Sequence, residues 1–381
     1  MGKNDKKAYL EAIRGRYRKA SRADKSRILD EFCAVCRYHR KYALRRLNQS
    51  TKKRVTQKSG RPSRYNVIEV MTPLRAIWLA TDQMASKRLK AAMPLWLPYY
   101  EEAHGILADD VRYKLLRISA SSMDRLLAPV RAQSGKRGLS GTKPGTLLKN
   151  QIPLQGQAWD VSQPGFIEAD TVAHCGNSLA GDFVWGLTMT DLYSGWTECR
   201  ATWNKGADGV MQQIKAIQQA LPFAVRGFDC DNGSEFLNWH LLRYFQTRKP
   251  PVQFTRSRPY HSNDNAHVEQ KNWSCVRQLF GYERFANARL VNAMNDLYAN
   301  EFSLLTNFFC PTMKLTDKTR VGSKIVKKYA VPETPAQRLL THESLTQQQK
   351  QRLIDIQAVL NPFALRAAIQ KKLRAIFKLV R

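Results

Sequence analysis

The chain has 381 residues, 43% of them hydrophobic, so it is long enough for more than one domain and apolar enough to build packed cores. Its formal net charge of +31 is distributed unevenly: residues 1–150 carry +22, residues 151–300 carry −1 and residues 301–381 carry +10. These figures exclude a disordered chain, and they favour a nearly neutral centre between two basic flanks that bind a polyanion.

The sequence contains no signal for a membrane or for export. No apolar run approaches the ~18–20 residues that a membrane span needs, and residues 1–7 lack the apolar core of a signal peptide. The seven cysteines, odd in number and scattered, are typical of reduced thiols rather than of a disulfide framework. We therefore expect a cytoplasmic protein, associated with the bacterial nucleoid, that has no membrane partner.

Residues 1–64 are predicted to form an N-terminal helix-turn-helix domain and linker. In the helix expected over residues 38–47, Tyr38, Tyr42 and Leu47 should face inward. The outward-facing cations of this helix are the expected DNA contacts: Arg40, Lys41, Arg45 and Arg46. The alternative is an ordinary amphipathic helix with a solvated basic face.

Three more basic stretches precede the centre of the chain. Arg61 and Arg64 belong to a Gly-Arg-Pro arm that could enter a minor groove, although a solvated linker fits equally well. Residues 65–131 are again helical and include a serine-capped helix with Arg125, which predicts a second helix-turn-helix domain. Residues 132–159 form a basic linker rich in Gly, Ser and Lys, in which Lys143 and Lys149 are candidate DNA contacts.

Residues 160–303 change to short strands that alternate with helices, which predicts a mixed α/β sheet with one core. In this pattern Asp191 is a hairpin-turn residue, and Glu235 lies in the first turn of a helix. The expected strands are 165–171, 183–190, 196–201, 224–228 and 252–255, and the expected helices are 207–221, 235–246 and 266–279. Residues 304–381 should form a basic, mainly helical C-terminal domain.

Three acidic residues of the central segment are spaced for metal chemistry. Asp170 ends a strand-like run, Asp231 follows the strand 224–228, and Glu269 lies in the first turn of the last helix. Taken singly, each would be a turn residue or a helix cap. The competing carboxylates are Glu168, Asp229 and Asp264.

Carboxylates from two strand ends and one helix can converge on hard cations such as Mg²⁺. A pair of such ions about 3.5–4 Å apart activates the attacking oxygen and neutralises the leaving oxygen of a phosphodiester. Desolvated carboxylates repel one another, so their convergence requires cations between them. The sequence therefore predicts a site for two Mg²⁺ ions, with Mn²⁺ as an alternative, on Asp170, Asp231 and Glu269.

With these motifs the chain resembles the integrase-core DDE transposases of bacterial insertion sequences, which are related to retroviral integrases. The resemblance lies in Asp170, residues 231–236, residues 258–260 and residues 265–272, and it covers about residues 160–300. It implies an RNase H-like core, a five-stranded mixed sheet flanked by helices, with Asp170, Asp231 and Glu269 as catalytic metal ligands.

The resemblance also implies a reaction on double-stranded DNA. The protein would bind the terminal inverted repeats of its element, cleave each end to expose a 3′-hydroxyl, and join that end to target DNA as a dimer or higher oligomer. Arg256, Arg258 and Lys271 are candidates for holding DNA near the site. Two rival interpretations are an RNase H-fold nuclease without strand transfer and a helix-turn-helix regulator with an inert core.

Two smaller expectations concern side chains outside the acidic triad. Trp239, Trp273 and Phe280 are expected to lie in the core rather than to stack on bases. A zinc site is not expected at Cys33, Cys36 and His39, because a fourth ligand is lacking.

Overall fold

The computed structural model describes residues 2–49, 65, 67–133, 162–230, 235–236, 239–256, 268 and 271–380. It divides into two compact units, residues 1–62 and residues 63–381. The second helical segment, the central segment and the C-terminal segment therefore belong to one unit, which is a coarser division than the sequence suggested.

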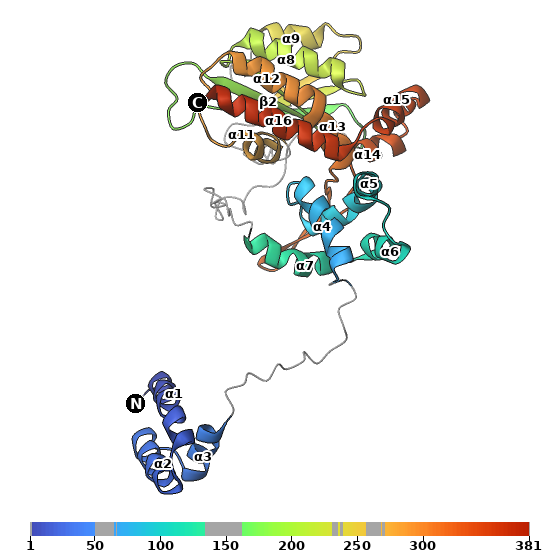
Figure 1. Cartoon of the computed structure of the whole chain (residues 1–381). Helices are drawn as coiled ribbons and strands as arrows, with labels where there is room; N and C mark the ends of the chain where they lie inside the picture. The colour runs from blue at the N-terminus through green and yellow to red at the C-terminus, as the bar shows by residue number, and fades with distance from the viewer. Residues whose placement is uncertain are drawn as a thin grey trace. The chain divides into compact units, whose positions relative to one another are not determined.

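The N-terminal unit consists of three helices around a small core (Figure 1): α1 (Lys3–Lys19), α2 (Arg22–Cys36) and α3 (Arg40–Asn48). Leu47 is buried and Tyr38 partly buried, as predicted. The prediction that Tyr42 faces inward is wrong, because its side chain is 38% exposed. On this helix the buried stripe runs through Ala43 and Leu47, four residues apart, and Tyr42 is rotated out of that stripe.

In the larger unit, four helices precede the sheet: α4 (Ile68–Ala80), α5 (Ser86–His104), α6 (Asp109–Arg117) and α7 (Ala120–Gln133). They are fastened to the C-terminal part of the chain through α5. The indole Nε1 of Trp96 donates to the carbonyl of Phe309 (2.9 Å), and Arg88 Nε donates to the carbonyl of Pro311 (2.6 Å). One continuous apolar core consequently runs from these helices into the sheet.

The centre of this unit is a five-stranded mixed sheet of order β3-β2-β1-β4-β5. Its strands are β1 (Phe166–Ala173), β2 (Val184–Asp191), β3 (Thr197–Trp203), β4 (Gly227–Cys230) and β5 (Gln253–Arg256). Strands β1, β2 and β3 pair antiparallel, whereas β1, β4 and β5 pair parallel. The parallel pairs need crossover connections, which are supplied by α8 (Ala207–Ala220) and α9 (Trp239–Gln246). The predicted mixed sheet with flanking helices is confirmed.

The segment after the sheet is helical and covers the free edge of β3. It contains the π-helical turn η1 (Asn272–Arg277), α11 (Gln278–Phe280), α12 (Arg289–Leu297), the π-helical turn η2 (Tyr298–Phe302) and α13 (Ser303–Phe309). The side-chain amide of Asn295 accepts from the N–H of Ala201 (2.6 Å) and donates to its carbonyl (3.0 Å). Asn307 does the same for Thr197 at 2.9 and 3.0 Å. These amides satisfy backbone groups that an open sheet edge would expose.

The C-terminal segment begins with a two-stranded sheet, β6 (Leu315–Val321) and β7 (Lys324–Tyr329). Three helices follow: α14 (Pro335–Thr341), α15 (Gln347–Ala358) and α16 (Pro362–Val380). Helix α16, red in Figure 1, packs beside α12, and Lys372 forms ion pairs with Asp296 (2.6 Å) and Glu301 (2.7 Å). Among the helices that the structure describes, none combines the length and apolar character needed to cross a lipid bilayer.

Candidate active site and DNA-binding surfaces

The carboxylate of Asp170 lies within β1, one residue beyond the last pair of β1 with β4. The prediction that Asp170 ends its strand is wrong, because pairing with β2 continues β1 to Ala173. Asp170 is partly buried. Its Oδ1 accepts from the N–H of Thr171 (2.7 Å), and its Oδ2 accepts from the amide Nδ2 of Asn272 (2.6 Å). Asn272 is 102 residues away in the sequence. A long-range contact thus orients this carboxylate.

Strand β4 lies beside β1 in parallel register. Glu168 pairs with Asp229, and Ala169 pairs with Cys230. The residues that follow Ala169 and Cys230 in the chain are Asp170 and Asp231. Residues 231–234, like residues 269–270, lie outside the described residues. The register is therefore known up to the residue immediately before Asp231.

Glu168 connects β1 to the residue that precedes Glu269. Its side chain is 4% exposed, and its Oε2 accepts from the backbone N–H of Val268 (3.1 Å), which is fully buried. Side chains alternate along a strand, so Glu168 and Asp170 share one face of the sheet. The chain segment that contains Glu269 is hence held at Val268 by Glu168 and at Asn272 by Asp170.

Of the other competing carboxylates, only Asp229 lies among the described residues. Asp229 Oδ1 accepts from the hydroxyl of Thr255 on the neighbouring strand (2.6 Å). Asp264 lies outside the described part of the chain. Within the described ranges, which omit Asp231 and Glu269, no three His, Cys, Asp or Glu side chains gather as a metal-binding group.

Glu235 does not lie in the first turn of a helix, and that prediction is wrong. It occupies a turn ahead of α9, its side chain is fully buried, and its Oε1 is 2.6 Å from Lys205 Nζ. Thr171 also donates its hydroxyl to Oε1 (3.1 Å). The ammonium group of Lys205 compensates the charge of this buried carboxylate.

Two predicted residues of the η1 region have unexpected environments. Lys271 is partly buried, and its Nζ donates to the carbonyl of Gly195 (3.3 Å), whereas contact with DNA would require the ammonium group to face outward. Burial lowers the pKa of this amine. Trp273 is 49% exposed, so its predicted core position is wrong: the turn buries Cys275 and Val276, and Trp273 is rotated away from them. Phe280 is fully buried, as predicted.

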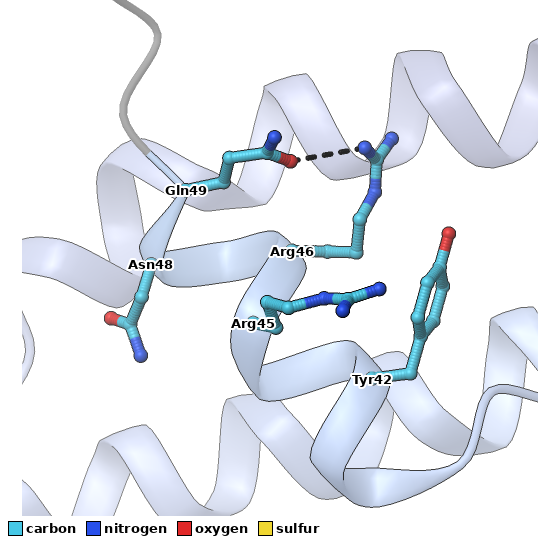
Figure 2. A pocket seen from close by; sticks show the side chains of 5 residues that line it. All are labelled: Tyr42, Arg45, Arg46, Asn48 and Gln49. Carbon is cyan, nitrogen blue, oxygen red and sulfur yellow. Dashed lines mark hydrogen bonds between the residues drawn. The ribbon is translucent and has the colours of Figure 1, made fainter.

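The predicted DNA contacts on α3 divide into two groups. Arg40 forms an ion pair with Asp30, and Arg46 Nη1 donates to Gln49 Oε1 (3.1 Å), so both are held by protein groups. Lys41 and Arg45 are exposed, and the Arg45 guanidinium lies over the Tyr42 ring at 5.4 Å. A pocket of about 440 Å³ opens on this surface (Figure 2), lined by Tyr42, Arg45, Arg46, Asn48 and Gln49.

The remaining candidates are placed only in part. Arg125 on α7 is exposed and donates to Ser122 Oγ (3.2 Å). Arg256 ends β5, but its side chain lies outside what the structure describes. Five other predicted DNA contacts lie entirely outside the described residues: Arg61, Arg64, Lys143, Lys149 and Arg258.

Asn272 and Glu168 make positioning contacts that the sequence interpretation did not predict. Asn272 stands three residues after Glu269, a spacing that puts two residues on the same face of a helix. Glu168 stands two residues before Asp170, on the same strand face. Both signals were present, but neither indicates which distant group the side chain contacts.

The chain is an α/β protein with a partly buried, oriented carboxylate, Asp170, on the first strand of its mixed sheet. No family model matches the chain. It is 40% identical over 334 residues to "Uncharacterized protein y4rM" of Sinorhizobium fredii (strain NBRC 101917 / NGR234), an alignment that covers 86% of this chain and 93% of that protein. The chain therefore belongs to the family of y4rM.

Two solved structures also align with part of the chain. The catalytic core domain of BIV integrase is 15% identical, with 45% of this chain and 91% of that chain covered and a TM-score of 0.29. The simian T-cell lymphotropic virus intasome in complex with PP2A regulatory subunit B56 gamma is 14% identical, with 48% and 59% covered and a TM-score of 0.29. These scores are too low to define the fold, which rests on the strand order and register given above.

Proposed function

We propose that this chain is a DDE transposase of a bacterial insertion sequence. It binds the terminal inverted repeats of its element, hydrolyses a phosphodiester at each end to free a 3′-hydroxyl, and joins that end to target DNA. The observation that carries the proposal is the bond from Asn272 to Asp170, together with the pairing of Ala169 with Cys230. These contacts bring Cys230, the residue before Asp231, and Asn272, three residues after Glu269, to the neighbourhood of Asp170.

The donor set fits a divalent metal. Asp170, Asp231 and Glu269 would supply carboxylate oxygens, the ligands that Mg²⁺ and Mn²⁺ prefer over nitrogen or sulfur. Cys230, the residue before Asp231, pairs with Ala169, the residue before Asp170. Two bound Mg²⁺ ions would polarise the scissile phosphate and lower the pKa of the attacking hydroxyl.

The chain's own residues position these ligands. Asn272 donates to Asp170 Oδ2 and thereby fixes the direction of the second oxygen, while the Thr171 N–H fixes the first. Glu168 holds the backbone of Val268 and so fixes where the next residue, Glu269, begins. Ligands that are held in this way before DNA binds need no rearrangement during the reaction.

DNA recognition is assigned to the basic helical parts. In the N-terminal unit, α2 and α3 form the helix-turn-helix, and Lys41 and Arg45 on the exposed face of α3 reach the DNA. A second helix-turn-helix is formed by α6 and α7, in which Ser119 caps α7 by accepting from the N–H of Ser122 (3.1 Å). Joining of two ends requires at least a dimer on DNA, at the bacterial nucleoid.

The test uses DNA that flanks the gene, labelled at its ends, with a plasmid target and Mg²⁺. Wild-type protein should yield labelled plasmid, whereas Asp170→Asn should bind the ends normally and join nothing. A nuclease would cleave the ends without labelling the plasmid. A regulator would retard the DNA and give no product. Either of the last two results with wild-type protein overturns the proposal.

A matched pair on β4 tests which carboxylate belongs to the site. Asp231→Asn should abolish joining, because it removes a metal ligand. Asp229→Asn should leave joining within a few-fold of wild type, since Asp229 is bonded to Thr255 and an amide oxygen can still accept that bond. Full joining by Asp231→Asn would remove this residue from the site.

A further inference from the structure

Strands β6 and β7 form a ribbon that belongs to no larger sheet. They are joined by a two-residue turn of Gly322, with φ of +61°, and Ser323. Every residue of both strands except Asp317 is exposed, and the exposed side chains include Val321 (63%) and Ile325 (47%). A two-stranded ribbon without a covering layer is only marginally stable in water. The exposure thus indicates a surface that functions with a partner.

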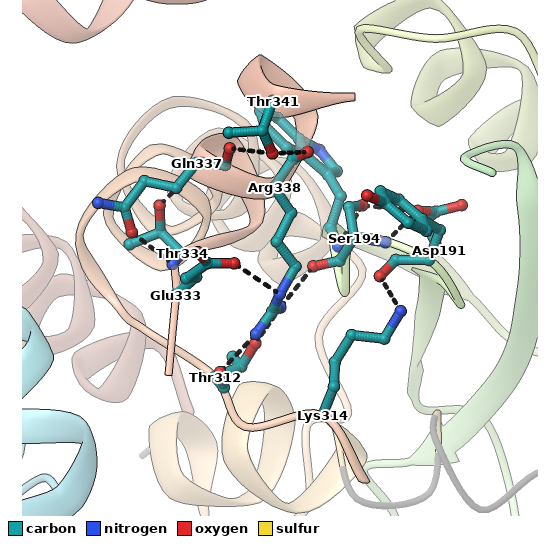
Figure 3. A network of polar contacts seen from close by, with 11 residues as sticks. Asp191, Ser194, Thr312, Lys314, Glu333, Thr334, Gln337, Arg338 and Thr341 are labelled. Atoms are coloured by element: carbon teal, nitrogen blue, oxygen red, sulfur yellow. Dashed lines mark hydrogen bonds and ion pairs between the residues drawn. The ribbon is translucent and has the colours of Figure 1, made fainter. Parts of the chain in front are cut away.

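The root of this ribbon is fixed to the core by a polar network (Figure 3). Arg338 donates from Nη1 to the carbonyl of Ser194 (2.8 Å) and from Nη2 to the carbonyl of Thr312 (2.5 Å). Lys314, the residue before β6, donates to the carbonyl of Tyr193 (2.5 Å). Thr312 and Glu333 bridge the two chain segments below the ribbon at 2.8 and 3.3 Å. The ribbon therefore projects in a defined direction from an anchored base.

The same network connects the root to the candidate active site. Gly195, in the turn that Arg338 holds through Ser194, accepts a hydrogen bond from Lys271. Lys271 is the neighbour of Asn272, which contacts Asp170. The ribbon and the Asp170 carboxylate are hence connected through one network of hydrogen bonds.

Charge is distributed unequally between the two faces of the ribbon. Side chains alternate along each strand, so the register assigns residues to faces. One face carries three cations and no acid: Lys318, Arg320 and Lys327, beside Leu315, Ile325 and Tyr329. On the other face Lys328 is 3.7 Å from Asp317, so one of its cations is already paired.

Lys318 and Lys327 are direct cross-strand partners on the first face. Like charges that face each other across two strands destabilise the pairing. A phosphate group bound between the two ammonium groups would attract both and so offset their mutual repulsion. A second copy of the ribbon would instead add the same unpaired cations, so a polyanion fits this face better than self-association.

We propose that the β6–β7 ribbon is an additional DNA-binding element that lies in the major groove of double-stranded DNA with its Lys318–Arg320–Lys327 face toward the phosphates. A two-stranded ribbon fits the width of that groove, about 12 Å. Aliphatic side chains between the cations contact the groove walls. This assignment extends the proposed function, because the ribbon holds DNA that the carboxylate site then cuts or joins.

The test compares two triple variants of the full-length protein that lose the same charge. One is Lys318→Ala, Arg320→Ala, Lys327→Ala on the ribbon. The other is Lys371→Ala, Arg374→Ala, Lys378→Ala on the exposed side of α16. Binding to a short labelled duplex is measured in EDTA over a series of NaCl concentrations, so no chemistry takes place.

The ribbon variant should bind roughly ten- to a hundredfold more weakly, and the slope of log K against log salt should fall in magnitude by about 2–3, near 0.9 for each lost phosphate contact. The α16 variant should keep the wild-type slope. The melting temperature of the ribbon variant should be unchanged or higher, because the Lys318–Lys327 repulsion is gone. Equal losses in both variants would show only a bulk charge effect and would overturn the proposal.

Two further measurements keep this result separate from the transposase proposal. Light scattering without DNA should give the same mass for wild type and ribbon variant. A smaller mass with unchanged DNA affinity would assign the ribbon to a subunit interface instead. Asp170→Asn should bind the duplex like wild type. If it also joins ends, the catalytic proposal falls while the ribbon assignment stands.

Discussion

Two aspartates on neighbouring strands of the same sheet have opposite surroundings. Asp191, which ends β2, is fully buried and accepts three hydrogen bonds, from the Gly165 N–H (2.8 Å), the Ser194 N–H (2.7 Å) and the Ser194 hydroxyl (2.6 Å). Burial raises the pKa of Asp191, and these bonds oppose the rise. Asp170 is partly buried and is oriented by the Asn272 amide.

The difference separates a structural carboxylate from a candidate metal ligand. Two of the three donors to Asp191 come from its own turn, so it closes the β2–β3 connection. The side-chain donor to Asp170 comes from a segment 102 residues away, beside the motif that contains Glu269. A carboxylate that is oriented from a distance and still partly accessible can serve a ligand, whereas a buried carboxylate with three donors stabilises its fold.

The largest expected effect is that of removing the Asp170 carboxylate. Asp170→Asn should lower the rate of end joining by at least about 10³-fold, or ~4 kcal/mol in activation free energy, because one metal-binding oxygen is lost. Its unfolding free energy should change little, since the Asn oxygen can still accept a hydrogen bond. Joining is measured on labelled ends and stability by urea denaturation. A large loss of stability would mean that Asp170 is structural after all.

On the neighbouring strand, Asp191→Ala should cost about 2–4 kcal/mol of unfolding free energy, because it leaves buried N–H groups without an acceptor. The matched control is Asp182→Ala in the loop before β2, which is exposed and should change stability by less than about 0.5 kcal/mol. Both are measured by urea denaturation. Equal stability of the two variants would contradict the structural role of Asp191.

His174, directly after β1, should make stability depend on pH. The ring of His174 is buried and stacks on Phe285, with 4.9 Å between the ring centroids. Burial lowers the pKa of this imidazole from 6.5 to about 3. Below pH 6.5 the imidazole of His174 is therefore protonated in the unfolded chain but stays neutral in the folded state until the pH approaches about 3. The contribution of His174 is present above that pH and is lost as the pH falls toward about 3.

Between neutral pH and about pH 5, this loss should be roughly 2 kcal/mol of unfolding free energy. His174→Phe, which keeps the aromatic packing and cannot be protonated, should remove that part of the pH dependence. Urea denaturation at the two pH values measures it. The same pH dependence in the variant would assign the effect to another group.

The smallest expected effect is that of removing the amide that orients the Asp170 carboxylate. Asn272→Ala should slow joining about tenfold, ~1.4 kcal/mol, because it removes the donor that orients Asp170 without removing a ligand. It should also raise the Mg²⁺ concentration needed for half-maximal joining, which a purely structural defect would not do. Asn300→Ala, on the exposed side of η2, is the control and should change neither value.

Sequence patterns predicted the elements around the site well where local periodicity determines the element. The strands around Asp170 and Asp191 and the helix at 207–221 follow from local periodicity, and the structure places them within a few residues of the expected bounds. Trp273 and Tyr42 were wrong because both lie next to a buried stripe, where a rotation of one residue decides between core and surface. Glu235 was wrong because its partner, Lys205, is remote in sequence.

The sequence by itself determined the elements of the central fold, the position of Asp170 on the first strand of the sheet and the basic character of both flanks, because these depend on the local order of residues. Only the tertiary structure decided that Asn272 orients Asp170, that Glu168 holds Val268, and that Arg338 anchors the β6–β7 ribbon. Each of those contacts joins segments about 100 or more residues apart. Such partners are chosen by the pairing of strands and the packing of helices, which no local pattern encodes.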